Sequence, residues 1–349
     1  MEFLSFNQHP GHDAFACLNE QFSIYFTREY HQYENAIGFE TGFVCHNGVL
    51  FPYRVYTKLF FRAIQFMHPP VDAHGNLLNA ADEKAFTEKT LRFLKDQGRF
   101  HRVSQPFTNE VFNAVPAGAT GAPFGKFYLP LEGKTEEDLI MGFQPRARRA
   151  VKEVMKEADK VQVRFGPNEL SVLHPMYTRL HQKQGLYSEP YETLQKQADI
   201  LGEKHCLISM IYDHDIPEGG VMALYTQREA CTFHGAVADK TRLQGSLRYL
   251  YWEVIRNFHQ KGVKTMAFGG ARLSDVSGTK LQGIQDFKSR FGAKIRKGFI
   301  WKADINPAAC KAFDAMMLAN MKLKGLKNGP DVIDFEKDRP VVVDDEAGQ

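Results

Sequence analysis

The chain has 349 residues, of which 43% are hydrophobic and 24% are charged, and 44 Lys and Arg stand against 41 Asp and Glu. This composition is that of an ordinary globular protein and excludes an intrinsically disordered or collagen-like chain. A formal net charge of +3 is too small to indicate a nucleic-acid or acidic membrane partner by itself, so any anion site must be local. The length predicts about two domains, each large enough for its own core.

Targeting and redox signals are weak. No apolar run is long enough to span a bilayer, and the start Met1-Glu2 lacks the basic region of a signal peptide. Five scattered cysteines without a C-x-x-C pair argue against a disulfide framework or structural zinc. His9 and His12, separated by Pro-Gly, are interpreted as part of a polar turn. We therefore expect a cytoplasmic protein without a membrane span, a bound metal or a DNA partner.

The first half is predicted to be mostly strands. Asn47-Gly48 lies between two apolar runs and tolerates positive φ at both turn positions, which indicates a β-hairpin. An amphipathic helix is expected at 81–97, because Phe86, Leu91 and Leu94 recur among charged residues and Gly98 follows. The other expected elements are strands at 60–67, 102–107 and 124–131, a Gly/Ala/Pro-rich loop at 115–123 and a basic helix that starts at Arg146.

The second half has a clearer pattern of the order β-α-α-β-β-β-α-β-α-β. The expected strands are 160–165, 206–212, 221–226, 231–238, 265–268 and 297–301, and the expected helices are 170–184, 190–203, 246–260 and 284–291. Turns are expected at 215–220 and at Gly269-Gly270. This order is neither pure βαβ alternation nor all-β. It predicts an α/β fold with a mixed (α+β) sheet and helices on both faces.

The loop Arg242-Leu-Gln-Gly-Ser-Leu247 precedes the predicted helix 246–260. A helix start presents free N–H groups and the positive end of the helix dipole, and a glycine lets a phosphate approach the backbone closely. Two interpretations stay open. The loop is either a phosphate site made by Arg242, Gln244, Gly245 and Ser246, or an ordinary helix-capping loop.

The segment Lys280–Lys302 contains seven Lys or Arg and one acid. On a helix Phe287 and Phe291 share a face, so we interpret the two rings as core anchors and expect the cations on the other side. The segment is either a solvated basic face or a seat for a phosphate or carboxylate, with Lys288 acting as a point charge.

Several motifs occur together here: Arg146-Ala-Arg-Arg149 in a basic helix, Met266-Ala-Phe-Gly-Gly270 after a long helix, and Phe287-Lys-x-x-Phe-Gly292. Over roughly residues 125–302 the sequence resembles the FemAB-type family and its BioF-type acetyltransferase-like relatives, which belong to the GNAT superfamily. The resemblance implies two tandem GNAT-like domains. Residues 1–145 would form a degenerate N-terminal unit, 146–305 a C-terminal domain with the donor site, and 306–349 a C-terminal helix and an acidic tail whose end is expected to be frayed.

The resemblance also implies a reaction, the transfer of an acyl group from the co-substrate acyl-CoA to an amine of a small molecule or peptide. Acetyltransferase-type folds bind the coenzyme A pyrophosphate on a loop in which Gln or Arg is followed three residues later by Gly and two residues after that by Gly or Ala. Arg242 and Gly245 match this pattern, whereas Leu247 departs from it. By the same resemblance Lys288, with Phe287 beside it, would balance charge at the reacting carbonyl.

Two other functions remain open. One is aminoacyl transfer from aminoacyl-tRNA to a peptidoglycan precursor, as in FemAB-like enzymes. The modest net charge and the lack of a long helical arm between 170 and 203 favour acyl-CoA over tRNA. The other is a non-catalytic GNAT-fold protein that holds an anionic ligand, because a fold does not fix a function.

No general base is identified from the sequence. His234 lies on an alternating strand pattern and Asp239 follows it, so both are candidates for taking the proton of the acceptor amine. Each also has a structural interpretation, since strand histidines are commonly hydrogen-bonded core residues and Asp commonly caps a turn.

Overall fold

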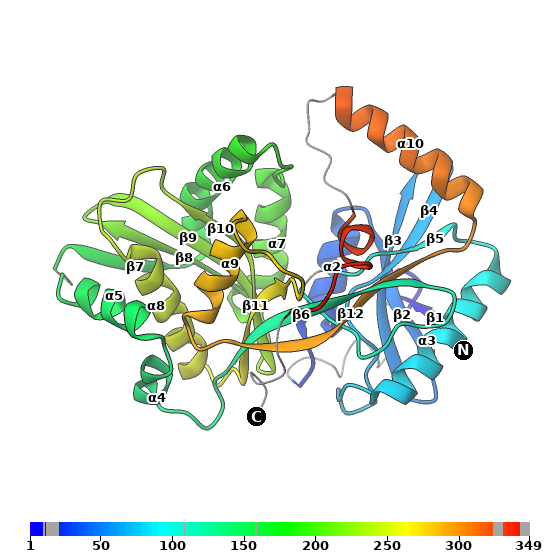
Figure 1. The fold of residues 1–349 in the computed structure, drawn as a ribbon, viewed down its shortest axis with the longest axis horizontal. Coiled ribbons are helices and arrows are strands. Elements are labelled where there is room, and N and C mark those ends of the chain that lie inside the picture. Colours follow the sequence, from blue (N-terminus) through cyan, green and yellow to red (C-terminus); the bar gives the residue numbers. More distant parts are fainter. Residues whose placement is uncertain (10, 12–20, 108, 158, 324–330, 343–349) are drawn as a thin grey trace.

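The structure is a computed structural model that describes residues 1–349 except 10, 12–20, 108, 158, 324–330 and 343–349. Its framework is one 12-stranded mixed sheet in the order β1-β2-β3-β4-β5-β12-β6-β11-β10-β9-β8-β7. Figure 1 shows two lobes, built mainly from the first and from the second half of the chain, joined by the long strands β6 and β12 that pass between them. The α/β fold with a mixed sheet is therefore as the sequence predicts.

The first lobe contains strands β1 to β5 and two helices. Its elements are β1 (Glu2–Ser5), η1 (Ile24–Phe26), α2 (Arg28–Ala36), β2 (Glu40–His46), β3 (Val49–Lys58), β4 (Phe61–Phe66), α3 (Ala80–Gln97) and β5 (Arg102–Ser104). The predicted hairpin is present, with φ of 50° at Asn47 and 76° at Gly48 between the paired strands β2 and β3. Helix α3 starts at the Asn79 cap and ends at Gly98 in the left-handed conformation, as expected.

The second lobe follows the predicted order closely. Its elements are α4 (Glu136–Met141), α5 (Pro145–Met155), β7 (Val161–Phe165), η2 (Pro167–Glu169), α6 (Leu170–Gln184), α7 (Tyr191–His205), β8 (Cys206–Asp213), β9 (Ile216–Tyr225), β10 (Glu229–Val237), α8 (Ser246–Gln260), β11 (Thr265–Ala271) and α9 (Lys280–Ser289). The remaining elements are β6 (Thr120–Pro130), β12 (Lys294–Asp304), α10 (Pro307–Leu323) and α11 (Val332–Glu336). Among the described residues no helix is both long and apolar enough to cross a bilayer.

The same unit occurs in both lobes. In the first, the antiparallel strands β2-β3-β4 are followed by helix α3 and by β5, which pairs parallel to β4. In the second, the antiparallel strands β8-β9-β10 are followed by helix α8 and by β11, which pairs parallel to β10. This repetition agrees with the two tandem units that the sequence resemblance implies.

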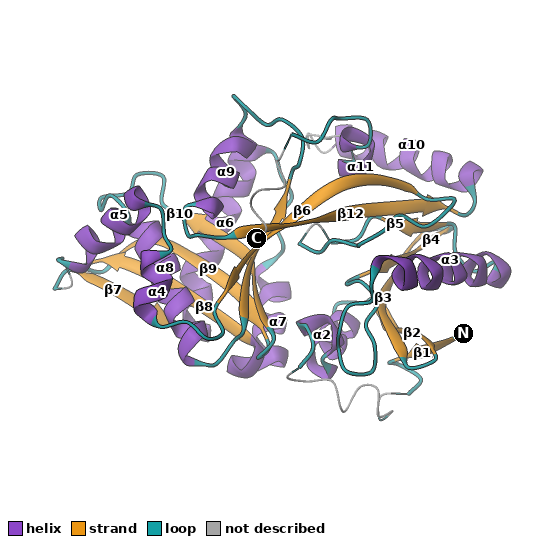
Figure 2. Ribbon diagram, turned by 60° about the horizontal axis from the view of Figure 1, so that its bottom comes forward, coloured by secondary structure: helices purple, strands orange, loops and turns teal. Residues whose placement is uncertain are grey.

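The units exchange their last strands. Strand β6 belongs to the first half of the chain but pairs with β11, whereas β12 belongs to the second half and pairs with β5. The two exchanged strands also pair with each other over Lys294–Lys302 and Thr120–Tyr128 (Figure 2). The predicted boundary between residues 145 and 146 therefore lies in a chain whose sheet is continuous across both halves.

Each lobe has its own core, and a third cluster lies between the lobes. Trp301 is buried in the first core and Trp252 in the second. The third cluster joins aromatic residues of η1 and α2, such as Tyr25 and Tyr30, to residues of α6 and α7, such as Leu173 and Leu201. Because this contact is apolar and buried, it holds the lobes in one arrangement.

Several predicted boundaries were wrong. Residues 216–220 belong to strand β9 and not to a turn, because the chain already reverses at His214, whose φ is 54°. Gly269-Gly270 lies inside strand β11 and not at its end, because β6 pairs with both glycines. Residues 120–123, expected in a loop, pair with β12.

The C-terminal tail is not simply frayed, since Ile333 of α11 is buried and Glu336 accepts a hydrogen bond from Ser274. Residues 343–349 lie outside the described chain.

Candidate functional site

Strands β10 and β11 separate after a short parallel contact. They pair only from Glu229 to Cys231 and from Thr265 to Ala267. Just beyond, both strands carry a register shift against their other neighbours, which leaves Phe233 of β10 and Phe268 of β11 without a partner in the register. A bulge re-aims the strand and leaves backbone groups outside the ladder. We call the gap between residues 231–234 and 267–270 the strand opening.

Lys288 reaches this strand opening from the last turn of α9. Its Nζ donates a hydrogen bond to the carbonyl oxygen of Gly270 at 2.8 Å and lies 5.5 Å from the centre of the Phe127 ring. Burial lowers the pKa of Lys288 to about 8, because a desolvated ammonium is disfavoured. Lys288 is thus a partly buried cation beside an interrupted sheet, and no carboxylate pairs with it among the described ion pairs.

Phe287 holds α9 in place. Its ring packs edge-on against Tyr251 at 5.2 Å and against Phe291 at 5.0 Å. Because consecutive helical residues point in different directions, this anchoring turns Lys288 toward the strand opening. The predicted Phe-Lys pair therefore combines a packing residue with a cation.

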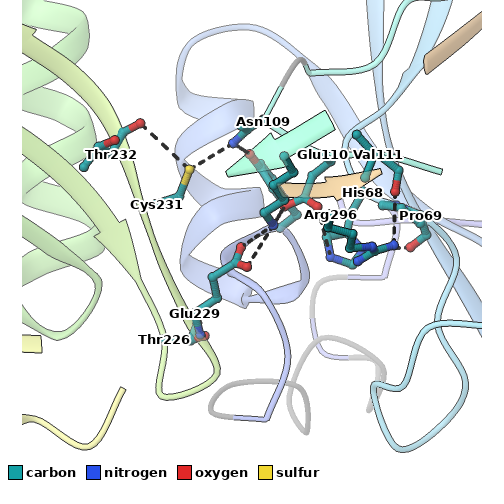
Figure 3. Close-up of polar contacts among 12 residues, drawn as sticks. His68, Pro69, Asn109, Glu110, Val111, Thr226, Glu229, Cys231, Thr232 and Arg296 are labelled. Carbon is teal, nitrogen blue, oxygen red and sulfur yellow. Dashed lines mark hydrogen bonds and ion pairs between the residues drawn. The ribbon is translucent and has the colours of Figure 1, made fainter. Parts of the chain in front are cut away.

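The first lobe covers the strand opening with Asn109. The Asn109 amide donates hydrogen bonds to Tyr25 Oη at 2.6 Å and to Cys231 Sγ at 3.2 Å (Figure 3). A Cβ atom on Gly269 would lie 3.9 Å from Lys288 Nζ and 4.0 Å from Asn109 Cβ. Lys288 and Asn109 therefore both lie near Gly269, whose φ of 77° favours glycine.

The loop at 242–246 is held by a carboxylate of the protein itself. Buried Glu218 of β9 accepts the Arg242 amide at 3.0 Å and the Leu243 amide at 3.4 Å, and it contacts the Ser246 hydroxyl at 3.4 Å. The Ser246 amide donates to the carbonyl oxygen of Leu243 at 3.2 Å. The side chains of Arg242 and Gln244 are exposed. Glu218 therefore binds the loop backbone and places a carboxylate beside the residues predicted to bind phosphate.

Gly245 is packed against helix α5. Its φ is 97°, and a Cβ atom there would lie 3.3 Å from Cβ of Ala150. Near this contact lies Arg248, in the first turn of α8. Burial lowers its pKa, and the charges of Arg290 after α9 and Arg146 of α5 lower it further. None of these three arginines forms an ion pair within the described chain. They make the surface beside the loop strongly positive.

The two candidate bases lie in different surroundings. His234 follows the bulge of β10 and packs against the Tyr177 ring, and burial lowers its pKa to about 4. Asp239 forms an exposed ion pair with Lys183 at 2.6 Å, which lowers its pKa. His234 therefore lies close to the strand opening and is neutral at pH 7, whereas Asp239 is engaged in a surface pair.

A cleft between the lobes leads to the bulge. It has a volume of about 790 Å³ and is lined by aromatic residues of both lobes, including Tyr33, Phe107 and Phe233, with His234 at its wall. Met317 and Met321 of α10 also line it. A substrate in this cleft would reach the strand opening through Phe233 and His234.

Sequence reasoning missed the contribution of the first lobe. Asn109 and Tyr25 lie far from the motifs of the second half, and their contact with Cys231 depends on tertiary packing. Lys126 was also missed, although a lysine inside the apolar strand Phe124–Leu131 was a usable signal. A metal site was not predicted, and the described residues contain no group of three or more potential ligands.

The fold defines a class, that of GNAT-type acyltransferase folds. Residues 144–289 match the family model described as acetyltransferase (GNAT) domain. The chain is similar in structure to FemX, with a TM-score of 0.65 and 11% identity over 89% of this chain and 99% of that one. It is also similar to the C-terminal domain of a putative lysylphosphatidylglycerol synthetase from Agrobacterium fabrum, with a TM-score of 0.50 and 14% identity over 80% of this chain and 89% of that one. No curated protein sequence matches.

Proposed function

We propose that this protein is an N-acyltransferase that transfers an acyl group from acyl-CoA to an amine of a small molecule or peptide. The observation that carries the proposal is the desolvated Lys288 ammonium beside Gly270, where β10 and β11 separate. A fixed cation in a partly water-excluded site stabilises the negative charge that develops on the carbonyl oxygen during acyl transfer. The four described cysteines are free thiols, which fits a cytoplasmic location.

The reaction needs no covalent enzyme intermediate. The free amine attacks the thioester carbonyl, the new C–N bond forms, and the C–S bond breaks. The thiolate of coenzyme A leaves and takes up a proton, and the amine nitrogen loses one proton, so the amide product keeps one N–H. Lys288 balances the oxyanion, and the neutral His234 is the candidate acceptor for a proton.

The donor phosphates would lie near the start of α8. The proposed groups are Arg242, Gln244, Gly245 and Ser246 of the loop. The arginines at 146, 248 and 290 add positive charge to the same surface. Helix N-termini favour anions by their free N–H groups and their dipole.

The test is acyl transfer by the full chain from radiolabelled acetyl-CoA to a panel of primary amines. Lys288→Met should lower kcat/KM at least about a hundredfold, the size of effect seen when a group that stabilises an oxyanion is removed. Lys280→Met is the matched control, because Lys280 is exposed at the other end of the same helix. Equal activity of Lys288→Met and the wild type would refute the role of Lys288.

Glu218 supports a second candidate donor, aminoacyl-tRNA, with a peptidoglycan precursor as acceptor. A buried carboxylate on the amides of 242 and 243 repels a pyrophosphate at that loop. The phosphates of a tRNA can instead be held by the arginines outside the loop. In a gel at moderate salt, charged tRNA but not CoA should then retard the protein.

Glu218→Gln separates the two donors. The amide of Gln can still accept from the loop but carries no charge, so this change should tighten CoA binding if the loop holds pyrophosphate, and should leave tRNA binding unchanged. Native mass spectrometry of the wild type and of Glu218→Gln measures the CoA that each protein retains. Retention of CoA without transfer to any amine would favour the third possibility, a non-catalytic ligand-binding protein.

A further inference from the structure

A second, smaller cavity lies between the lobes beside the strand opening. Its volume is about 320 Å³, and its walls come from both lobes and from the exchanged strands: Ser23, His68, Leu77, Glu110, Lys126, Tyr128, Arg228, Glu229, Thr265 and Arg296. This volume is at the lower end of the range of small-molecule sites. Its lining includes charges of both signs, from two glutamates, one lysine and two arginines.

One wall is a buried ion network. Lys126 Nζ lies 2.8 Å from Glu110 Oε1 and 2.8 Å from both carboxylate oxygens of Glu229 (Figure 3). Burial alone would lower the pKa of Lys126, but the two carboxylates outweigh it and hold the pKa above its usual value. Lys126 is therefore a permanent cation whose hydrogens are used, and it fixes both carboxylates in the wall.

Next to this network are two acceptors to which no residue of the described chain donates a hydrogen bond. His68 Nδ1 lies 2.8 Å from the carbonyl oxygen of Pro69, so Nδ1 carries the proton of the neutral ring. The other ring nitrogen, Nε2, then has a lone pair, and it lies 4.0 Å from Glu110 Oε2. His68 and Glu110 both line the cavity, and an ammonium group placed between these two acceptors would donate a hydrogen bond to each.

Three other lining residues supply hydrogen-bond donors instead of acceptors. Arg228 and Arg296 line the cavity, and neither forms an ion pair within the described chain; they donate hydrogen bonds to Gln21, Val111 and Asn113. Ser23 is 5% exposed, and its hydroxyl has no hydrogen-bond partner among the described residues. Two guanidinium groups with spare donors and a free hydroxyl are suited to a carboxylate.

We propose that this cavity binds the zwitterionic head of an α-amino acid, with its ammonium between Glu110 and His68 and its carboxylate on Arg228, Arg296 and Ser23, and that this amino acid is the acceptor amine. The role of the amino acid as acceptor rests on the proposed function. The position of the cavity supports this role: Asn109, next to Glu110, lies less than about 8 Å from Lys288 Nζ, since Asn109 Cβ and Lys288 Nζ are each within 4.0 Å of one point at Gly269. Lys126 is also the register partner of Gly270.

In the transfer the amino nitrogen forms the new bond to the acyl carbon, and the bond from that carbon to the thiol sulfur or ester oxygen breaks. The ammonium loses two protons in all, one to the leaving group and one to the solvent. The product is an N-acyl amino acid, which has lost the positive charge that Glu110 and His68 bind. The product therefore binds this cavity more weakly than the substrate.

Thermal unfolding of the full chain with each proteinogenic amino acid, tested singly, examines the binding step without any donor. At least one amino acid should raise Tm, because a ligand that binds only the folded state stabilises it. Its N-acetyl and carboxamide derivatives, which each lack one charge, should bind at least about tenfold more weakly. The proposal is overturned if no amino acid raises Tm, or if both derivatives bind as well as the parent.

Variants test the assigned walls. Arg228→Gln should weaken binding of the same amino acid at least about tenfold. Arg256→Gln is the control, since Arg256 pairs with Glu253 on α8 outside the cavity. Ser23→Ala should raise Tm of the free protein, because a buried hydroxyl without a partner is removed, and should reduce the shift caused by the amino acid. If Arg228→Gln and Ser23→Ala both bind like the wild type, the assignment is wrong.

The result for binding is independent of the result for catalysis. An amino acid that binds and is never acylated by either donor leaves the cavity assigned as a binding site and refutes its acceptor role; the proposed function is refuted as well only when no amine of the panel is acylated. Acyl transfer to amines that lack a carboxylate, at the same kcat/KM as to amino acids, keeps the proposed function and refutes the acceptor role of this cavity.

Discussion

At the scale of single residues, Lys288 shows a conflict between stability and function. The structure buries an ammonium beside Gly270 O with no carboxylate partner, and this burial lowers its pKa from 10.5 to about 8. Below pH 8 the folded protein bears the desolvation cost of this charge. A position chosen only for stability would hold an apolar side chain. Perturbed groups of this kind concentrate at functional sites.

We therefore predict that Lys288→Met is more stable than the wild type at pH 7, by about 1–3 kcal/mol, since one pKa unit corresponds to about 1.4 kcal/mol. The lost hydrogen bond to Gly270 offsets part of this gain. Between pH 8 and 10.5 the unfolded chain binds the Lys288 proton more tightly than the folded one, so the wild type gains stability with rising pH and the difference shrinks. Urea unfolding at pH 7 and pH 10 measures it. A variant that is less stable than wild type at both pH values would contradict the prediction.

His68 provides a second test at this scale. Burial lowers its pKa from 6.5 to about 3, so its contribution to stability is complete above pH 6.5 and is lost as the pH falls toward 3. Linkage gives a loss of about 2 kcal/mol at pH 5. His68→Gln should lose correspondingly less stability between pH 7 and pH 5 in urea titrations. The exposed His214→Gln should behave like the wild type, and equal acid sensitivity of all three proteins would show that His68 is not the cause.

At the scale of elements, the contact of α5 with α8 decides what Gly245 does. The sequence suggests a glycine that admits a phosphate, and the structure shows a glycine that also admits helix α5, with Ala150 against its backbone. Both roles need the absence of a side chain. The carboxylate of Glu218 fixes the same loop from the side of strand β9.

Alanine substitutions separate backbone strain from packing. Gly245 and Gly262 both have positive φ, 97° and 75°, but a Cβ atom on Gly262 meets nothing within 4 Å, whereas one on Gly245 lies 3.3 Å from Ala150. We expect Gly262→Ala to cost about 1 kcal/mol from strain alone and Gly245→Ala about 2–3 kcal/mol. Urea unfolding measures both. Equal costs would show that α5 yields without penalty.

At the scale of the whole molecule, the exchanged strands couple the two lobes. Strands β6 and β12 pair with each other and each enters the sheet of the other half. The aromatic cluster between η1, α2 and helices α6 and α7 adds a shared core. Neither lobe can lose its last strand without disrupting the other, so the chain should unfold as one cooperative unit.

The two tryptophans test this coupling, because Trp252 lies in the core of the second lobe and Trp301 in that of the first. In Trp252→Phe the remaining fluorescence reports the first lobe, and in Trp301→Phe it reports the second. In each variant we expect the fluorescence transition in urea to coincide with that of the far-ultraviolet circular dichroism. Separate midpoints in either variant would mean that the lobes unfold independently.

The sequence by itself determined the local elements and the motifs. The helices at 81–97, 170–184 and 246–260 were predicted almost to the residue, because their apolar spacing and their glycine or cap signals act within a few turns. The same local information placed Phe287, Lys288 and the loop 242–246 among the candidates. The extent of β11 through Gly269-Gly270 was missed, because glycine suggests a turn unless a neighbouring strand is known to pair with it.

Tertiary structure alone decided which residues meet. The contact of Asn109 with Cys231, the Lys126 network with Glu110 and Glu229, and the capture of the loop by Glu218 join residues from 16 to 122 positions apart. Such contacts depend on strand order, and nothing in the local pattern indicates that β6 and β12 change places. A pattern of side chains sets what a segment forms, whereas the exchanged strands set which segments share a site.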